Sequence, residues 1–246
     1  MPNASAASAG LFSGLVLLVV IVIGFGFRRA GVGWVPAVAL LLAYLATPGL
    51  LACLGALDRY DTPPAPALVL LLGLTLLTVA VVLSRLGTRL AAGVGMGAVV
   101  ALQAFRIPVE LLLHRLYDEG DVPLQMTYSG RNFDMVSGVS GLILGAWLLS
   151  GGRVPRAAVL AWNVLGFALL ANIIGVAILC TPAPFRQFTE GPPNLLPSTF
   201  PYIWLPSFLV QVALGSHLLV FRQLWLQREE RVSPTAEPGA AADGGA

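Results

Sequence analysis

Long apolar stretches recur along the chain, separated by short segments that hold most of its polar residues. Each stretch approaches or exceeds the roughly 20 residues that a helix needs to cross the hydrocarbon core of a bilayer. The stretches are residues 11–27, 34–57, 66–86, 90–113, 132–150, 157–180 and 203–225. The pattern predicts an all-α fold with one seven-helix transmembrane domain over residues 1–231. A disordered tail, rich in Pro, Gly and Ala, is expected over 232–246.

Composition supports a membrane protein and excludes several other classes. Hydrophobic residues make up 57% of the 246 residues and charged residues 11%, whereas soluble domains carry about 25% charged residues. A soluble globular protein, a disordered chain, a coiled coil and a nucleic-acid binder are therefore excluded. All 14 basic residues are arginine, so chemistry that needs a lysine Schiff base or a lysine-bound pyridoxal phosphate is excluded as well.

Arginines are distributed very unevenly between the loops on the two faces of the predicted bundle. Nine of them fall on one face: Arg28, Arg29, Arg85, Arg89, Arg153, Arg156, Arg222, Arg228 and Arg231. The positive-inside rule makes that face cytoplasmic, with the N-terminus outside and the C-terminus inside a bacterial plasma membrane. Residues 1–10 carry no charged side chain, so the first stretch does not resemble a signal peptide.

Ionisable and amide side chains concentrate in the last four stretches, and the first three are expected to be scaffold. Such groups cost about 2.5–3.5 kcal/mol each at membrane depth, which makes them functional candidates. Gln103, Arg106, Glu110 and His114 share one helix face. With a helix start near residue 91 and about 1.5 Å rise per residue, Arg106 is expected roughly 22 Å up, near the outer headgroups.

The polar residues near that level define an expected outer site. Asp134 and Asn172 reach the same height as Arg106, so we expect Arg106 to pair with Asp134. Glu110 and His114 are expected at a hydrated boundary. The candidate catalytic residues are Glu110, His114 and Asp134. The candidate binding residues are Arg106, Arg131, Asn132, Asn172 and Arg186.

Two further features are expected near this site. Asn163 and His217 lie deeper, at similar heights, and form either an interhelical hydrogen bond or a proton relay. Six prolines in residues 181–202 forbid a regular helix there. Aromatic residues in the same segment suit either a lid over the outer site or a plain interfacial loop. Together with Arg106 and Arg131, Arg186 would suit a phosphate or carboxylate headgroup.

Metal, cofactor and disulfide signals are weak or absent. No nucleotide-binding, HExxH or CxxC motif occurs. Glu110 and His114 have ligand spacing on a helix, but two ligands are too few for a metal site, and we expect neither a metal nor a cofactor. Cys53 and Cys180 both lie near outer helix ends, where they form either a disulfide or two inert thiols.

Three short segments carry a resemblance to known proteins. Residues 105–110 (FRIPVE), 130–134 (GRNFD) and 184–186 (PFR) resemble those of a group of bacterial multi-pass inner-membrane proteins. The resemblance covers residues 100–225, and because that group has no assigned activity it implies no function. The helix order also resembles sugar-efflux transporters built as three helices, a linker helix and three helices. A transport path between two such repeats would be lined by polar groups from both halves of the chain. In this sequence the first three stretches contribute almost none. The chain resembles microbial rhodopsins in topology only, because it lacks their lysine.

Three functions remain open from the sequence. The first is an enzyme or binder that takes a lipid or a lipid-linked anionic headgroup from the extracytoplasmic side, with Glu110 or His114 as acid or base. The second is a small-molecule or proton-coupled transporter, with Arg106 and Asp134 as a gate. The third is a non-catalytic sensor or accessory protein. The expected partners are the lipid bilayer and a lipid or anionic small molecule, and the sequence does not indicate an oligomeric state.

Overall fold

Residues 4–232 are described by a computed structural model, in which they form helices and connecting loops without strands. The expected tail, from residue 233 onward, lies outside the described residues. The α-helices are α1 (Ala6–Arg29), α2 (Trp34–Cys53), α3 (Pro66–Leu83), α4 (Arg85–Gly93), α5 (Met96–Leu102), α6 (Arg106–Asp118), α7 (Asp134–Leu149), α8 (Arg156–Leu179) and α9 (Val210–Val232). Shorter 3₁₀ or π turns are η1 (Gln103–Phe105), η2 (Leu124–Met126), η3 (Leu196–Ser198) and η4 (Leu205–Leu209).

Six helical segments of the described chain are long and apolar enough to cross a membrane: Ala6–Arg29, Trp34–Cys53, Pro66–Leu83, Met96–Asp118, Arg156–Leu179 and Leu205–Arg228. The chain is thus a helical protein of the multi-pass membrane type, as its sequence predicts. Large apolar side chains such as Leu40 and Leu76 are about 60% exposed, which suits a surface in contact with lipid. The seventh predicted span is α7, an apolar helix of 16 residues.

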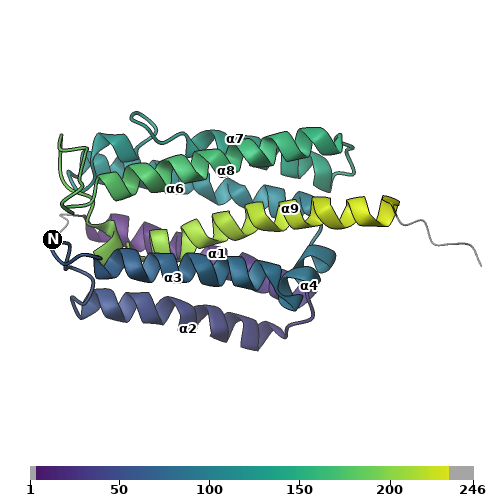
Figure 1. Cartoon of the computed structure of the whole chain (residues 1–246), viewed down its shortest axis with the longest axis horizontal. Coiled ribbons are helices and arrows are strands. Elements are labelled where there is room, and N and C mark those ends of the chain that lie inside the picture. The colour runs from purple at the N-terminus through teal and green to yellow at the C-terminus, as the bar shows by residue number, and fades with distance from the viewer. Residues whose placement is uncertain (1–3, 233–246) are drawn as a thin grey trace, which may run out of the picture.

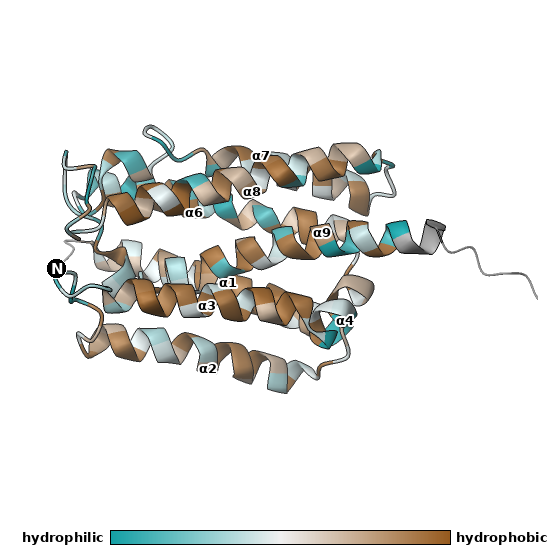
Figure 2. Cartoon of the chain, viewed as in Figure 1, coloured by the Kyte–Doolittle hydropathy of each residue, from teal (hydrophilic) through white to brown (hydrophobic). Residues whose placement is uncertain are grey.

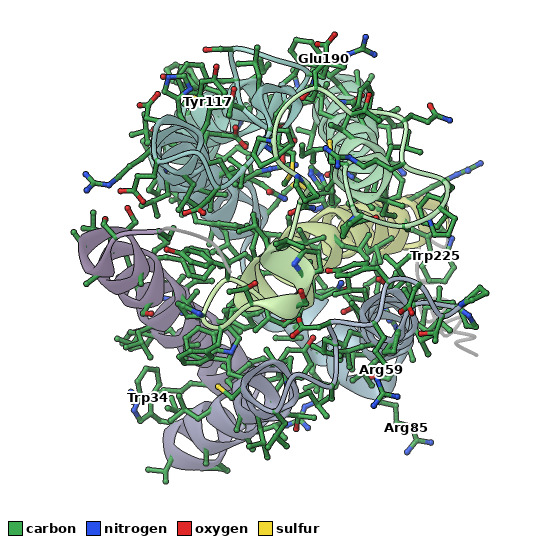
Figure 3. All side chains as sticks on the ribbon, turned by 90° about the vertical axis from the view of Figure 1, so that its left-hand side faces the viewer. Trp34, Arg59, Arg85, Tyr117, Glu190 and Trp225 are labelled. Atoms are coloured by element: carbon green, nitrogen blue, oxygen red, sulfur yellow. The ribbon has the colours of Figure 1, made fainter. Side chains whose placement is uncertain are left out.

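The helices run side by side, with α9 through the middle of the bundle. Figure 1 shows α6, α7 and α8 on one side of α9, and α1, α2 and α3 on the other. The arginine-rich ends of the helices, including α4 and the end of α9, gather on the right in Figure 1, and the hydropathy colours of Figure 2 show polar residues concentrated at the two ends of the bundle. In the end-on view of Figure 3, Arg85 and Trp225 lie at the periphery.

The fourth predicted span differs from the structure in its starting point. Residues 85–93 form the separate helix α4, which Ser84 caps by accepting hydrogen bonds from two backbone amides. The membrane-spanning segment begins only at Met96, after a break at Val94 and Gly95. Arg106 is therefore about 15 Å from the start of its segment, near the middle of Met96–Asp118.

Pro108 lies where this span changes its helical form. Proline lacks the backbone N–H that would bond to the carbonyl four residues earlier, at Ala104. Residues 103–105, around that carbonyl, form the 3₁₀ turn η1. The helix is therefore distorted directly before Arg106.

A row of small residues brings α7 close to α5 and η1. A Cβ atom placed on Gly145 would lie 2.4 Å from the backbone nitrogen of Ala101, and one on Gly141 would lie 3.0 Å from Cβ of Gln103. The two glycines are four residues apart and lie on one face of α7, where small residues allow helices to approach closely. Their packing holds the N-terminal end of α7, where Asp134 lies, next to the start of α6.

Candidate functional site

The centre of the candidate site is a buried ion pair between α6 and α7. Nε of Arg106 donates to Oδ2 of Asp134 at 2.9 Å, and a second guanidinium nitrogen contacts the same oxygen. Arg106 is 2% exposed and Asp134 7% exposed. The carboxylate lies in the first turn of α7, where the helix dipole favours negative charge. The predicted pairing is confirmed.

Asn132 connects this ion pair to Glu110. Its Nδ2 donates to Oε1 of Glu110 at 2.6 Å and to the carbonyl of Met126 at 3.1 Å. Its Oδ1 accepts the backbone N–H of Asp134 at 3.1 Å. Glu110 is 1% exposed, so the expectation that water hydrates its carboxyl group is wrong, because neighbouring helices and Asn132 cover it.

His217 extends the network into α9 and α8. Nη1 of Arg106 lies 3.3 Å from Nε2 of His217, and Nδ1 of His217 lies 2.8 Å from Oδ1 of Asn163. Because a guanidinium can only donate, Nε2 accepts and the Nδ1–H tautomer donates to Asn163. Nδ2 of Asn163 donates to the carbonyl of His217 at 3.0 Å. The predicted contact between Asn163 and His217 is confirmed, but it is not a separate, deeper pair.

The imidazole of His217 fits against α8 only because residue 166 is glycine. A Cβ atom on Gly166 would lie 2.6 Å from Cε1 of His217. Both Asn163 and His217 are fully buried. The sequence therefore provides both the polar partner of the ring and the space that the ring occupies.

A cavity of about 430 Å³ lies beside the polar network. Apolar side chains of α3, α6, α8, η4 and α9, together with the segment 194–197, form most of its wall. Its polar side chains include Arg106, Glu110, Asn132 and Asp134. Within the described residues, Oε2 of Glu110 and Oδ1 of Asp134 are buried without a hydrogen-bond partner. The cavity thus combines an apolar wall with carboxylate oxygens that lack donors.

The loop over residues 181–202 covers one end of this cavity. Nδ2 of Asn194 donates to the carbonyl of Ala177 at 3.0 Å, and its backbone N–H donates to the carbonyl of Cys180 at 2.9 Å. Leu196 is 1% exposed and, with Pro197, lines the cavity. Of the two expectations for this loop, a cover over the site agrees with the structure.

The other expected site residues lie away from the cavity. His114 stacks on Tyr128 with 4.4 Å between ring centroids. The exposed guanidinium of Arg131 lies over the ring of Phe188. Asn172 is exposed and donates to the carbonyl of Arg131 at 2.8 Å.

Arg186 also turns away from the expected anion site. Its Nε donates to the carbonyl of Phe188 at 2.8 Å, and its Nη2 donates to the carbonyl of Gly191 at 2.9 Å. Arg106 is the arginine that lines the cavity. The expected gathering of Arg106, Arg131 and Arg186 around one pocket is therefore not formed.

The expectation that the first three spans are only scaffold is wrong for α3. Leu68, Leu72 and Thr75 line the cavity. Nε2 of Gln211 on α9 lies 3.3 Å from Oγ1 of Thr75, and Thr78 donates to Oε1 of Gln211 at 3.0 Å. Threonines in an otherwise apolar helix were the sequence signal for this contact.

Metal and disulfide chemistry find no support in the described residues. They contain no group of three His, Cys, Asp or Glu side chains that could hold a metal ion. Cys53 is exposed, Cys180 is buried, and both are free thiols.

Comparison with known proteins gives no match: neither a family model, nor a curated protein, nor a solved structure is significantly similar to this chain.

Proposed function

We propose that this protein binds an amphiphile taken from the bilayer. The apolar chain of the ligand occupies the cavity between α3, α8 and α9, and its polar end meets Glu110 and Asp134. The observation that carries the proposal is an otherwise apolar cavity whose lining includes Glu110 and Asp134, each with one carboxylate oxygen that has no hydrogen-bond partner among the described residues. A volume of about 430 Å³ lies in the range of small-molecule sites, about 300–1,000 Å³.

The charges around the cavity favour a polar end that donates hydrogen bonds. Two carboxyl groups, Glu110 and Asp134, face one guanidinium, which already pairs with Asp134. A buried acceptor without a donor costs about 1–3 kcal/mol, so a hydroxyl or an ammonium group would be stabilised there. The anionic headgroup expected from the sequence would meet two carboxyl groups but only one guanidinium, which is already paired, and the proposal therefore names a neutral or cationic headgroup.

The proposal includes the seven-span topology in a bacterial plasma membrane. α7, at about 24 Å, is shorter than a bilayer core of about 30 Å, but it packs along α5 within the bundle and serves as the seventh span. With the arginine-rich end in the cytoplasm, the cavity extends from mid-membrane toward the extracytoplasmic side. The cover formed by residues 181–202 then faces outward.

Proton-coupled transport is a second candidate, favoured by one observation. The polar network does not end at the cavity but continues from Arg106 to His217 and Asn163. Such a chain of polar groups suits a relay across the inner half of the membrane. An acid–base dyad of Glu110 and His114 is less well supported, because His114 does not line the cavity.

A photolabelling experiment tests the proposed site directly. A monoacylglycerol with a diazirine in its acyl chain is added to the protein in phosphatidylcholine nanodiscs, irradiated, and mapped by mass spectrometry. We expect labelling on the cavity faces of α3, α8 and α9, strongly reduced in Ala177→Trp, which fills the cavity. The control Ala171→Trp places the same ring on an exposed position of α8. Labelling spread evenly over the lipid-facing surface would contradict the proposal.

The same preparation separates binding from transport. In liposomes loaded with a pH-sensitive dye, addition of the monoacylglycerol should change the internal pH only if transport is proton-coupled. His217→Gln should then abolish the pH change while leaving photolabelling intact. Binding without a proton flux would support the binding function and contradict proton-coupled transport.

A further inference from the structure

A second apolar cavity lies at the arginine-rich end of the bundle, separate from the candidate site. Its volume is about 660 Å³, and α1, α2, α3, α5 and α9 form most of its wall. Arg29, the last residue of α1, is its one charged lining residue among those described. The cavity thus offers space for hydrocarbon with a single cation at its edge.

A second guanidinium lies close to that edge. Helix α4 packs against the end of α1, where a Cβ atom on Gly93 would lie 2.5 Å from the carbonyl oxygen of Arg29. Nη2 of Arg89, also on α4, would lie 2.7 Å from a Cβ atom on Gly31. Arg29 and Arg89 therefore flank the same turn between α1 and α2.

Neither of these arginines has an acidic partner among the side chains that the structure describes. Arg106 pairs with Asp134 and Arg115 with Glu119, at other places in the bundle. Among the described side chains, residues 4–228, no acidic residue lies at this end of the bundle. Arg222 points elsewhere, since it donates to the carbonyl of Val82 and to Thr88. Two unpaired cations thus stand beside an apolar cavity.

We infer that this cavity binds one anionic phospholipid, whose acyl chain enters it and whose phosphate contacts Arg29 and Arg89. Basic pockets between membrane helices bind anionic lipid headgroups, and a guanidinium binds phosphate oxygens with two parallel hydrogen bonds. Because the described charged side chains near the mouth are positive, a zwitterionic lipid lacks the net attraction that selects an anionic one. The inference concerns a different cavity and does not depend on the proposed function.

Thermal unfolding with added lipid tests the headgroup. Purified protein in a neutral detergent is mixed with phosphatidylglycerol or with phosphatidylcholine of the same chains. We expect phosphatidylglycerol to raise Tm by several degrees more, and the difference to shrink at high salt. In Arg29→Gln/Arg89→Gln the difference should vanish. In the matched control Arg153→Gln/Arg156→Gln, which removes two cations from the same end but outside the cavity, it should persist.

Three outcomes would overturn the inference. Equal stabilisation of the wild type by both lipids would remove the selectivity. Equal losses in the two double variants would show diffuse attraction to the whole basic end. Full stabilisation by glycerol phosphate alone would show a soluble-anion site without a role for the acyl chain.

The acyl chain is tested on its own by filling the cavity. Gly26 lines the cavity, whereas Gly14 on the same helix has open space around it. Gly26→Leu should reduce the number of phosphatidylglycerol molecules retained in native mass spectrometry by one, and Gly14→Leu should not. Unchanged retention in Gly26→Leu would place the lipid elsewhere.

Discussion

Nη1 of Arg106 lies 3.3 Å from Nε2 of His217, although the two residues are 111 positions apart in the chain. This contact joins the α6–α7 ion pair to the α8–α9 hydrogen bonds. Polar groups from α6, α7, α8 and α9 are thereby held in one buried network beside the mostly apolar cavity. The network fixes the position of Glu110 and Asp134 at the cavity.

The ion pair can be tested by removing one partner and then both. Asp134→Ala leaves the buried guanidinium of Arg106 without its carboxylate, and we expect it to destabilise the protein by about 3–5 kcal/mol. Arg106→Met/Asp134→Leu removes both charges and should recover most of that loss. Both are measured as thermal or denaturant unfolding in detergent. A single variant as stable as the wild type would show that the pair contributes little.

The space around His217 can be tested without removing a polar group. Gly166→Ala places a methyl group 2.6 Å from the present position of Cε1, so the ring must move and its hydrogen bonds must weaken. We expect a lower Tm. Gly175→Ala on the same helix has nothing within 4 Å of the new atom and should be neutral or slightly stabilising.

A double-mutant comparison identifies the cause of the lower Tm expected for Gly166→Ala. In a His217→Ala background the ring is absent, so Gly166→Ala should cost much less than in the wild type. An equal cost in both backgrounds would assign the effect to the backbone of α8 instead.

The sequence predicts much of the fold of the described residues but misjudges where the fourth span starts and how deeply Glu110 is buried in the protein. Apolar runs predict the spanning helices, and the cost of buried charge predicts the Arg106–Asp134 pair. The break at Val94 and Gly95 was missed, because the apolar pattern continues through both residues. That error placed Glu110 at the boundary, whereas it is buried.

Side-chain direction accounts for the remaining errors at the site. Sequence position puts Arg131 and Arg186 on the correct side of the protein. It does not predict that the guanidinium of Arg131 lies over the ring of Phe188. Nor does it predict that the guanidinium of Arg186 donates to two loop carbonyls. Likewise, the part that α3 plays in the cavity depends on which face of a largely apolar helix turns inward, and only Thr75 and Thr78 mark that face in the sequence.

Glu119 ties the start of α1 to the end of α6 and should make stability depend on pH. Its carboxylate accepts hydrogen bonds from the backbone and hydroxyl of Ser5 and from the hydroxyl of Ser8. Burial raises its pKa, but these bonds and Arg115 outweigh that effect and hold the pKa below the ordinary value of 4.5. A lowered pKa stabilises the folded state above about pH 4.5, and the contribution is lost as pH falls through the lowered value.

The expected profile distinguishes Glu119 from other carboxylates. The stability difference between wild type and Glu119→Gln should stay constant from about pH 6 to 8 and shrink below the ordinary value of 4.5. Asp118→Asn, at the exposed neighbouring position, should keep the wild-type profile. A Glu119→Gln difference that is unchanged at low pH would mean that the carboxylate charge does not contribute.

Binding of a monoacylglycerol to wild type and Glu110→Gln in nanodiscs tests the central claim most directly. Glutamine keeps the bond to Asn132 but presents a donor where Glu110 presents a free acceptor, so the ligand hydroxyl loses its partner. We expect Kd to rise at least about tenfold, corresponding to about 1.4 kcal/mol. The control Glu190→Gln changes an exposed loop carboxylate and should leave Kd unchanged. Equal Kd values for wild type and Glu110→Gln would contradict the account.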